Sequence, residues 1–247
     1  MLHWFPYLLA RPLIGLWLAT SPHSWQNRFA ADDSPHVHAS GTDPDRVLLT
    51  GDGVATGRGV LTHDLGLAGY LARSLSARTG HAVDVDVVVD EKMTVRSCLA
   101  AIANVDLFRF DIIVLSVGAN EALRLKGVAA WRNAVGTLLS NLEHQAPAAA
   151  RIFVLSIPVF GPKTRLPAPL AHIVDQHVQK LNATTATLVA ARPTVTLMPV
   201  TEDNEFEPES RHVYQRWADG IAVRINEELT AESCGDRDDR PGAPFTR

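Results

Sequence analysis

Apolar positions follow two alternating spacings along most of the chain, one typical of strands and one typical of helices. Short apolar runs rich in Val, Ile and Leu predict buried strands at residues 47–50, 83–89, 112–117, 152–157 and 195–200. Between them, apolar side chains recur at helical spacing over residues 67–79, 95–102, 128–142, 170–190 and 212–229. Strands that alternate with helices predict a parallel sheet with right-handed crossovers. We therefore expect an α/β protein, a three-layer α/β/α sandwich around a five-stranded parallel sheet.

The first twenty residues are largely apolar, but the run is interrupted. Pro6 and the pair Arg11-Pro12 break it, and the unbroken part, residues 13–19, is shorter than the roughly 20 residues that span a bilayer. A secretory signal would place basic residues before an unbroken apolar core, so a cytoplasmic or membrane-associated location is favoured over secretion. We expect residues 1–20 to dock on the domain, or alternatively to lie on a membrane surface as a peripheral contact.

The rest of the chain divides by composition. Residues 21–45 are rich in Ser, His, Asp and Pro and read as a linker, so residues 1–45 form an apolar N-terminal segment with its linker. The periodic pattern of a single domain covers residues 46–229. Residues 230–247 are polar, with Gly and Pro, and we expect a disordered tail.

Composition and charge exclude several classes of function. The 247 residues carry a net charge of −4, which gives no reason to expect nucleic-acid binding. Cys98 and Cys234 are the two cysteines, too few for a disulfide framework or a zinc ligand set. We expect neither a metal nor a cofactor.

Polar and glycine-rich turns follow three of the predicted strands. They are Gly51-Asp52-Gly53, Asp90-Glu91-Lys92 and Gly118-Ala119-Asn120. Open α/β sheets place their ligand sites at the carboxyl edge of the strands. The sequence therefore predicts that these three turns meet at one site.

Three motifs occur in the order found in the SGNH hydrolases, also called the GDSL family, which the chain resembles over roughly residues 46–229. They are Leu48-Leu49-Thr50-Gly51-Asp52, Val114-Leu115-Ser116-Val117-Gly118-Ala119-Asn120-Glu121 and Tyr214-Gln215-Arg216-Trp217-Ala218. The resemblance implies a flavodoxin-like SGNH hydrolase fold and a small-molecule ester or acyl ligand. The family includes bacterial sugar O-acyltransferases, and the start Ala10-Arg11-Pro12-Leu13 and the overall length are similar to one branch of these, the diglucosylglycerate octanoyltransferases.

The resemblance also shows where the chemistry of the family is missing. In the family a serine follows Gly-Asp and attacks the ester carbonyl, with a histidine as its base and an aspartate that orients the histidine. Gly51 and Asp52 match the start of that motif, but Gly53 stands in place of the serine. Its backbone N–H could still donate to an oxyanion, although a simple turn glycine is the favoured interpretation.

The two other oxyanion positions of the family fall on Lys92, which departs from the family residue, and on Asn120, which matches it. Lys92 stands where the resemblance places a glycine, either as a pocket residue that would crowd or recharge the site or as a solvated loop lysine. Asn120 matches the asparagine, two residues after Gly118, and its alternative role is to cap the turn. Glu121 stands where the family often has aspartate.

The histidine and its acidic partner can be placed in two registers. Glu209 and His212 have the Asp-x-x-His spacing with Glu for Asp, which would make His212 the base. Counting back from Trp217 instead puts Pro208 at the histidine position and Glu205 at the acidic position. We favour the second register, in which His212 is an ordinary residue of the last helix.

Three readings of function follow. The first is a catalytically impaired relative that binds an ester, because loss of the nucleophile costs about a millionfold in turnover. The second is an active sugar O-acyltransferase or an esterase with a displaced nucleophile, and direct transfer between two bound substrates would rely mainly on proximity. The third is a dinucleotide-binding protein, in which Gly51, Gly53 and Gly57 admit a pyrophosphate and Asp90 holds a ribose.

Overall fold

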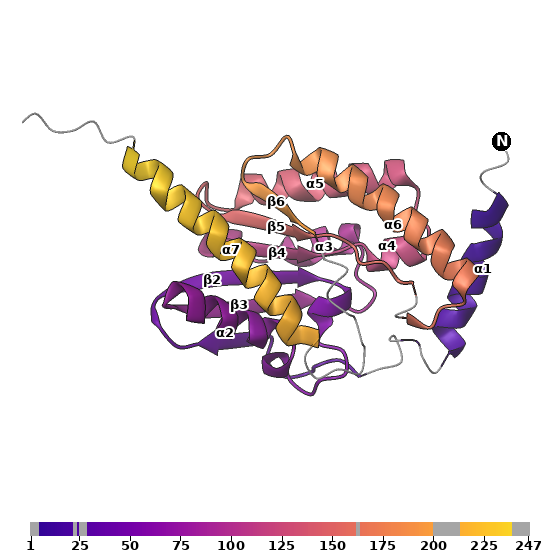
Figure 1. The fold of residues 1–247 in the computed structure, drawn as a ribbon, viewed down its shortest axis with the longest axis horizontal. Coiled ribbons are helices and arrows are strands. Elements are labelled where there is room, and N and C mark those ends of the chain that lie inside the picture. Colours follow the sequence, from indigo (N-terminus) through magenta and orange to yellow (C-terminus); the bar gives the residue numbers. More distant parts are fainter. Residues whose placement is uncertain (1–4, 22–23, 25–28, 162–163, 200–212, 239–247) are drawn as a thin grey trace, which may run out of the picture.

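The computed structural model describes residues 5–21, 24, 29–161, 164–199 and 213–238. Figure 1 shows helices on both faces of a central sheet, with α7 crossing one face and α1 standing at one end of the molecule. The helices are α1 Phe5–Thr20, α2 Leu67–Thr79, α3 Val95–Ile102, α4 Ala119–Leu123, α5 Val128–Gln145, α6 Ala168–Val189 and α7 Val213–Asp238, and the short 3-10 helices are η3 Gly53–Thr56, η4 His63–Leu65 and η5 Leu107–Arg109. The predicted α/β sandwich is confirmed.

Within the described residues the sheet has six strands in the order β1-β3-β2-β4-β5-β6. Their bounds are β1 His36–Ala39, β2 Thr42–Gly51, β3 His81–Val89, β4 Ile112–Ser116, β5 Arg151–Leu155 and β6 Val195–Met198. The strands from β2 to β6 pair in parallel, as predicted. The chain therefore reverses direction only at one edge of the sheet, where β1 pairs antiparallel with β3.

Strand β1 corrects the predicted count of five strands. It lies in the segment expected to be a linker, and β2 also begins earlier than expected, at Thr42. The alternation in β1 is too short to stand out in the sequence, since only Val37 and Ala39 turn inward. The outward residues His36 and His38 meet Asp86 and Asp84 of β3 at 2.7 and 2.8 Å.

Alternate side chains along β2 belong to two different cores. Leu48 packs with α3, α5 and α6 on one face of the sheet. Its neighbours Val47 and Leu49 pack with α2 and α7 on the other face. Because successive side chains of a strand point to opposite faces, one strand can contribute to both cores. This two-sided burial explains why the predicted strands read as unbroken apolar runs.

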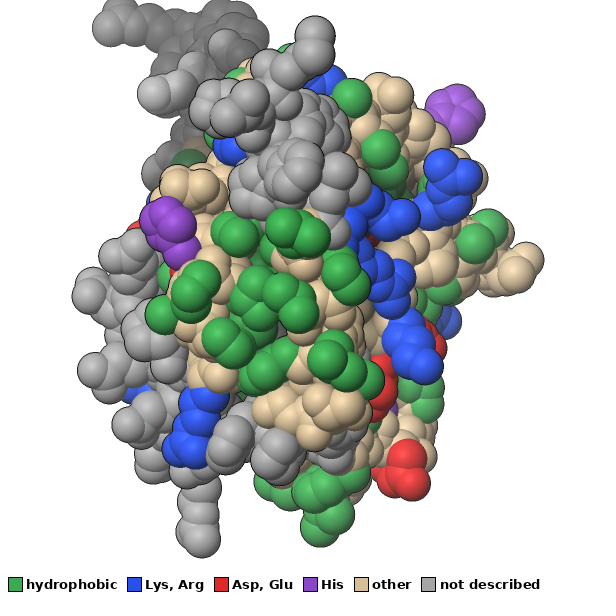
Figure 2. All heavy atoms as spheres, turned by 90° about the vertical axis from the view of Figure 1, so that its right-hand side faces the viewer, with side chains coloured by type: hydrophobic (Ala, Val, Ile, Leu, Met, Phe, Trp, Pro, Cys, Tyr) green, Lys and Arg blue, Asp and Glu red, His purple; other side chains and the backbone are tan. Residues whose placement is uncertain are grey.

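The two ends of the described chain differ in how they are held. At one end α1 docks on the domain through Ala10 and Ile14, which are buried in the core of α3, α5 and α6. Figure 2 looks onto this side of the molecule and shows apolar side chains gathered at the centre of the face. At the other end α7 continues to Asp238, beyond the helix end expected near residue 229. No helix among the described residues is long and apolar enough to cross a bilayer.

Candidate functional site

Gly51 brings the ends of β2 and β4 into unusually close contact. A Cβ built on Gly51 would lie 1.8 Å from the carbonyl oxygen of Ser116, and φ of Gly51 is +133°. The next residue continues the contact, since Asp52 N–H donates to Ser116 O at 2.6 Å and Ser116 Oγ donates to Asp52 O at 3.0 Å. Only glycine fits at the end of β2, and this fixes where Asp52 and Gly53 emerge.

The side chain of Asp52 joins the turn after β2 to the turn after β4. Its Oδ2 accepts hydrogen bonds from the backbone N–H of Asn120 at 3.0 Å and from Asn120 Nδ2 at 2.9 Å. Burial raises the pKa of Asp52 to about 7, and the charge of Glu121 acts in the same direction, while the hydrogen bonds from Asn120 oppose the rise. The surroundings of this carboxyl therefore favour its protonated form compared with an ordinary aspartate.

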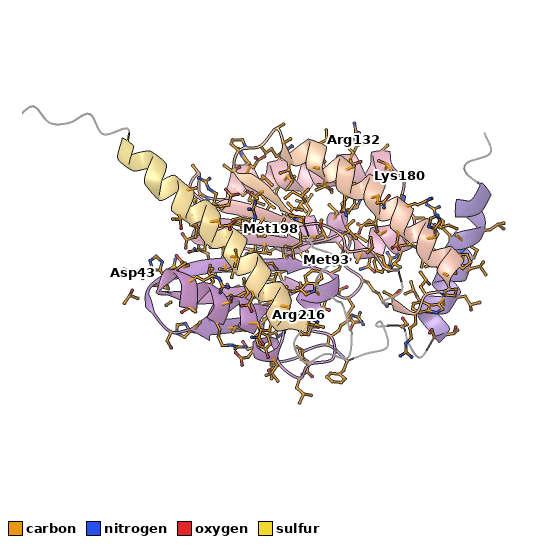
Figure 3. The ribbon with its side chains drawn as sticks, viewed as in Figure 1. Asp43, Met93, Arg132, Lys180, Met198 and Arg216 are labelled. Carbon is orange, nitrogen blue, oxygen red and sulfur yellow. The ribbon has the colours of Figure 1, made fainter. Side chains whose placement is uncertain are left out.

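Asn120 is brought to the predicted site, but its amide group faces the interior. Nδ2 lies 2.9 Å from Asp52 Oδ2, 3.0 Å from Glu91 O and 2.9 Å from Met93 O. An amide nitrogen has two hydrogens, so three internal acceptors already surround them. Figure 3 labels Met93 near the middle of the molecule. Asn120 thus ties three strand ends together and has no spare hydrogen for a bound oxyanion in this conformation.

Gly53 occupies the nucleophile position with open space beside it. It is the first residue of η3, with φ of +60°, and a Cβ there would contact only Ala119 Cβ, at 3.7 Å. Among the described residues none accepts a hydrogen bond from Gly53 N–H. The site therefore has room for a side chain and an available backbone donor, but no nucleophile at this position.

Lys92 does not contribute the predicted oxyanion donor. Its backbone N–H donates to Asp90 Oδ1 at 2.7 Å, and the residue is exposed. This is the local hydrogen bond that an aspartate makes two residues ahead in a turn. The geometry favours the solvated loop lysine of the two interpretations.

Arg58 is a site residue that the sequence analysis missed. Its side chain is only 7% exposed and its guanidinium lies 3.0 Å from Glu91 Oε2. Burial lowers the pKa of Arg58, while the nearby charges of Glu91, Tyr214 and Asp52 oppose this. The available signal was a charged residue between two glycines, Gly57 and Gly59, shortly after the nucleophile position. A buried cation near Asp52 can attract a polar or anionic ligand group.

Glu121 adds a second buried acid close to Asp52. Its Oε1 accepts from Val95 N–H at 2.7 Å, so it caps the start of α3. Its Oε2 is buried and makes no hydrogen bond among the described residues. Burial raises the pKa of Glu121, because a charge there would lose its hydration without full compensation. The family resemblance had suggested an acid here but not its burial.

A buried histidine, His63 in η4 between η3 and α2, pairs with Asp33, an exposed residue that precedes β1. His63 Nδ1 lies 2.6 Å from Asp33 Oδ1, and His63 N–H donates to the same oxygen at 2.9 Å. Burial acts to raise the pKa of Asp33, but the hydrogen bonds and charge of His63 lower it overall. Neither residue stood out in the sequence, because Asp33 lies in the predicted linker and His63 follows no recognisable motif.

The two candidate dyads fall outside the described residues. Glu209 and His212, with the alternative pair Glu205 and Pro208, precede the start of α7 at Val213. The motif that follows them does reach the site: Tyr214 Oη donates to Arg58 O at 2.7 Å. Both registers therefore stay predictions.

The fold, the order of the strand ends and the sequence together identify the family. The model of the GDSL-like lipase and acylhydrolase family matches residues 49–225. The chain belongs to this family. No curated protein sequence matches the chain.

Several solved lipase and esterase structures have the same fold. The lipase/acylhydrolase from Enterococcus faecalis matches with a TM-score of 0.58 and 16% identity over 74% of this chain and 96% of that chain. The lipase Lip_vut3 from a goat rumen metagenome matches with a TM-score of 0.59 and 12% identity over 74% of this chain and 97% of that chain. The esterase EstA from Pseudoalteromonas matches with a TM-score of 0.53 and 15% identity over 74% and 99% of the two chains. At these identities the likeness concerns the fold.

The dinucleotide alternative does not fit the observed turn. A pyrophosphate site needs the N-terminus of a helix directly after the glycine turn. Here the turn leads into the four-residue 3-10 helix η3, and α2 begins only at Leu67. The glycines serve a close strand contact at Gly51 instead of a phosphate cradle.

Proposed function

We propose that this GDSL-family protein binds a carboxylic ester or an acyl group at the carboxyl edge of its sheet and has lost hydrolysis through a serine nucleophile. The observation that carries the proposal is Gly53, which stands at the nucleophile position with open space in front of it. Removing the nucleophile from a comparable triad costs about 10⁶-fold in turnover, whereas substrate binding does not depend on that hydroxyl.

The remaining groups suit binding better than covalent catalysis. The backbone N–H of Gly53 can donate to a carbonyl oxygen, and Arg58 supplies a nearby buried cation. The side-chain amide of Asn120 and the backbone N–H of Lys92 already donate hydrogen bonds to acceptors within the protein. With one oxyanion donor available in place of three, stabilisation of a tetrahedral intermediate would also be weak, since each lost donor costs about 10²–10³-fold in turnover.

The proposal is tested by measuring binding and turnover on the same ligand. We expect purified protein to bind p-nitrophenyl octanoate in a calorimetric titration and to release no more p-nitrophenol than the buffer does. Ala119→Phe should abolish binding, because Ala119 faces the open space beside Gly53. Ala129→Phe is the matched control, since Ala129 is exposed on α5.

Two outcomes would overturn the proposal. Hydrolysis at the rate of ordinary esterases, reproduced in independent preparations, would show that another nucleophile acts. Transfer of an octanoyl group from octanoyl-CoA to a sugar by the unmodified protein would instead show an active acyltransferase.

A further inference from the structure

The outer side of α1 carries a stripe of leucines that the rest of the described chain leaves uncovered. Leu9, Leu13 and Leu16 are 61, 52 and 60% exposed, whereas Ala10 and Ile14 on the inner side are 2 and 0% exposed. The leucines recur at intervals of four and three residues, which places them on one side of a helix. The helix is thus held by one side and presents an apolar stripe on the other.

A basic hollow lies beside this stripe, between α1 and the segment that follows α4. It has a volume of about 440 Å³ and is lined by Arg11, Gly15, Leu18, Ala19, Leu123, Arg124 and Lys126. Its three charged residues are all cations, and none of them forms a salt bridge within the described part of the chain. Arg11 donates to the carbonyl of Leu125, which holds its guanidinium at the hollow.

The apolar stripe and the basic hollow share one face of the molecule. Two residues correspond to about 200° of helical rotation, so Arg11, Gly15 and Leu18 lie across α1 from the leucines. The exposed Pro12 and Ala19 lie between the two sets on the outer side of the helix, which is therefore apolar and has Arg11 at one border. Figure 2 shows this face, with apolar side chains at its centre and basic side chains along one edge. Lys180, labelled on α6 in Figure 3, is a further exposed cation. Burial lowers the pKa of His177, a hydrogen bond with the backbone of Lys126 opposes this, and the charges of Lys180 and Arg11 lower the pKa further, so both cations lie near His177.

We propose that α1 and the basic hollow form a docking surface for a bilayer that contains anionic phospholipid. The leucine stripe enters the boundary between headgroups and acyl chains, and Arg11, Arg124 and Lys126 meet lipid phosphates. An apolar helix face bordered by cations is the arrangement of helices that lie in the membrane interface. The cations gather on this face although the whole chain has a net charge of −4, so the face is complementary to a negative surface.

A second copy of the chain is a poorer occupant of this surface. A two-fold dimer would place the same patch on both subunits. The cations of one subunit would then lie near the cations of the other, with no acidic side chain among the residues that line either hollow. Like charges brought together in this way oppose association.

The surface lies at the end of the molecule that carries the candidate site. Helix α1 packs against α4, and α4 begins at Ala119, just after the carboxyl end of β4. Docking would therefore hold the carboxyl edge of the sheet near the bilayer. The docking surface does not depend on the proposed ester binding and is tested without it.

The test is sedimentation of the full-length protein with vesicles. We expect binding to vesicles of phosphatidylcholine mixed with phosphatidylglycerol, and much weaker binding to phosphatidylcholine alone or at high salt. Lys126→Glu should weaken binding by at least about fivefold, because each cation at an anionic bilayer contributes about 1 kcal/mol. Leu13→Ser should weaken it on both kinds of vesicle.

Matched controls come from the other side of the sheet and from the opposite strand ends. Arg224→Glu changes an exposed cation of α7, and Phe108→Ser removes an apolar side chain that is 73% exposed before β4. Both should bind vesicles as the unmodified protein does, and all four variants should keep its circular dichroism spectrum. Absence of binding to the anionic vesicles would overturn the proposal, as would equal losses in test and control variants. Concentration-dependent dimerisation that Leu13→Ser abolishes, without vesicle binding, would identify a second copy as the occupant.

Discussion

Gly53 combines two properties that decide the effect of a substitution there. Its φ of +60° is unfavourable for any residue with a Cβ, while the space in front of it is open. We therefore expect Gly53→Ser to fold and to lower the free energy of unfolding by about 1–2 kcal/mol, the cost of the left-handed conformation. Ester hydrolysis should stay at the background level, because a serine without a base is a weak nucleophile. Denaturant titration and p-nitrophenyl acetate hydrolysis measure the two effects.

The Gly53→Ser variant also distinguishes the two registers in which the catalytic histidine can be placed. In Gly53→Ser, adding Pro208→His and Glu205→Asp should raise hydrolysis by on the order of 10²-fold, since a positioned general base contributes about that much. Adding His212→Ala to Gly53→Ser should change nothing. If Gly53→Ser alone is active and His212→Ala removes that activity, the register with His212 as the base is correct.

Asp52 predicts a pH dependence of stability. Its pKa is 3.8 in an ordinary carboxyl and about 7 in the folded chain, so between these values the folded state holds a proton that the unfolded state releases. The free energy of unfolding therefore falls as the pH rises from about 4 to about 7, by roughly 1.4 kcal/mol per pH unit at most. In Asp52→Asn the part of this dependence that comes from Asp52 should be absent, although the raised pKa of Glu121 still contributes, so the stability of the variant relative to the unmodified protein should rise with pH. Glu227→Gln on exposed α7 should keep the original profile, and identical profiles for all three proteins would contradict the assignment.

At the scale of elements, the turn from β4 to α4 holds the site in place. Gly118 has φ of +114°, and a Cβ there would lie 2.5 Å from Ile157 Cδ1 and 2.7 Å from Trp131 Cη2. Gly118→Ala should lower the free energy of unfolding by about 2–4 kcal/mol through overpacking and backbone strain. Gly127→Ala is the control, because nothing lies within 4 Å of its Cβ position, and it should cost less than about 0.5 kcal/mol. Chemical denaturation of both variants tests the difference.

These elements also show which features of the structure can be predicted from the sequence. The order of strands and helices, and the meeting of Asp52 with Asn120, follow from apolar spacing and from the rule that parallel strands end at one edge. The orientation of the Asn120 amide toward the interior and the burial of Arg58 could not be predicted, because both depend on partners distant in sequence. Strand β1 was not predicted, because it is stabilised mainly by its pairing with β3 and its own composition is not typical of a strand.

At the scale of the whole molecule, the sheet links two cores into one unit. Leu48 and Leu49 are neighbours in β2, both fully buried, but they face different cores. Trp131 lies in the first core and Trp217 in the second. Because the strands are shared, loss of either core removes packing from the sheet that supports the other.

Leu48→Ala and Leu49→Ala should therefore destabilise the same transition. Each should lower the free energy of unfolding by about 2–5 kcal/mol, the range for a leucine deleted from a packed core. Urea unfolding is followed by fluorescence in two variants that each keep one of the five tryptophans of the chain, with the other four changed to Phe. The variant that keeps Trp217 reports the second core, the variant that keeps Trp131 reports the first, and circular dichroism is the common reference. In each background the fluorescence and dichroism curves should coincide, and either leucine variant should shift both to lower urea. A leucine variant that shifts the fluorescence of its own core and leaves the transition of the other unchanged would show two separate folding units.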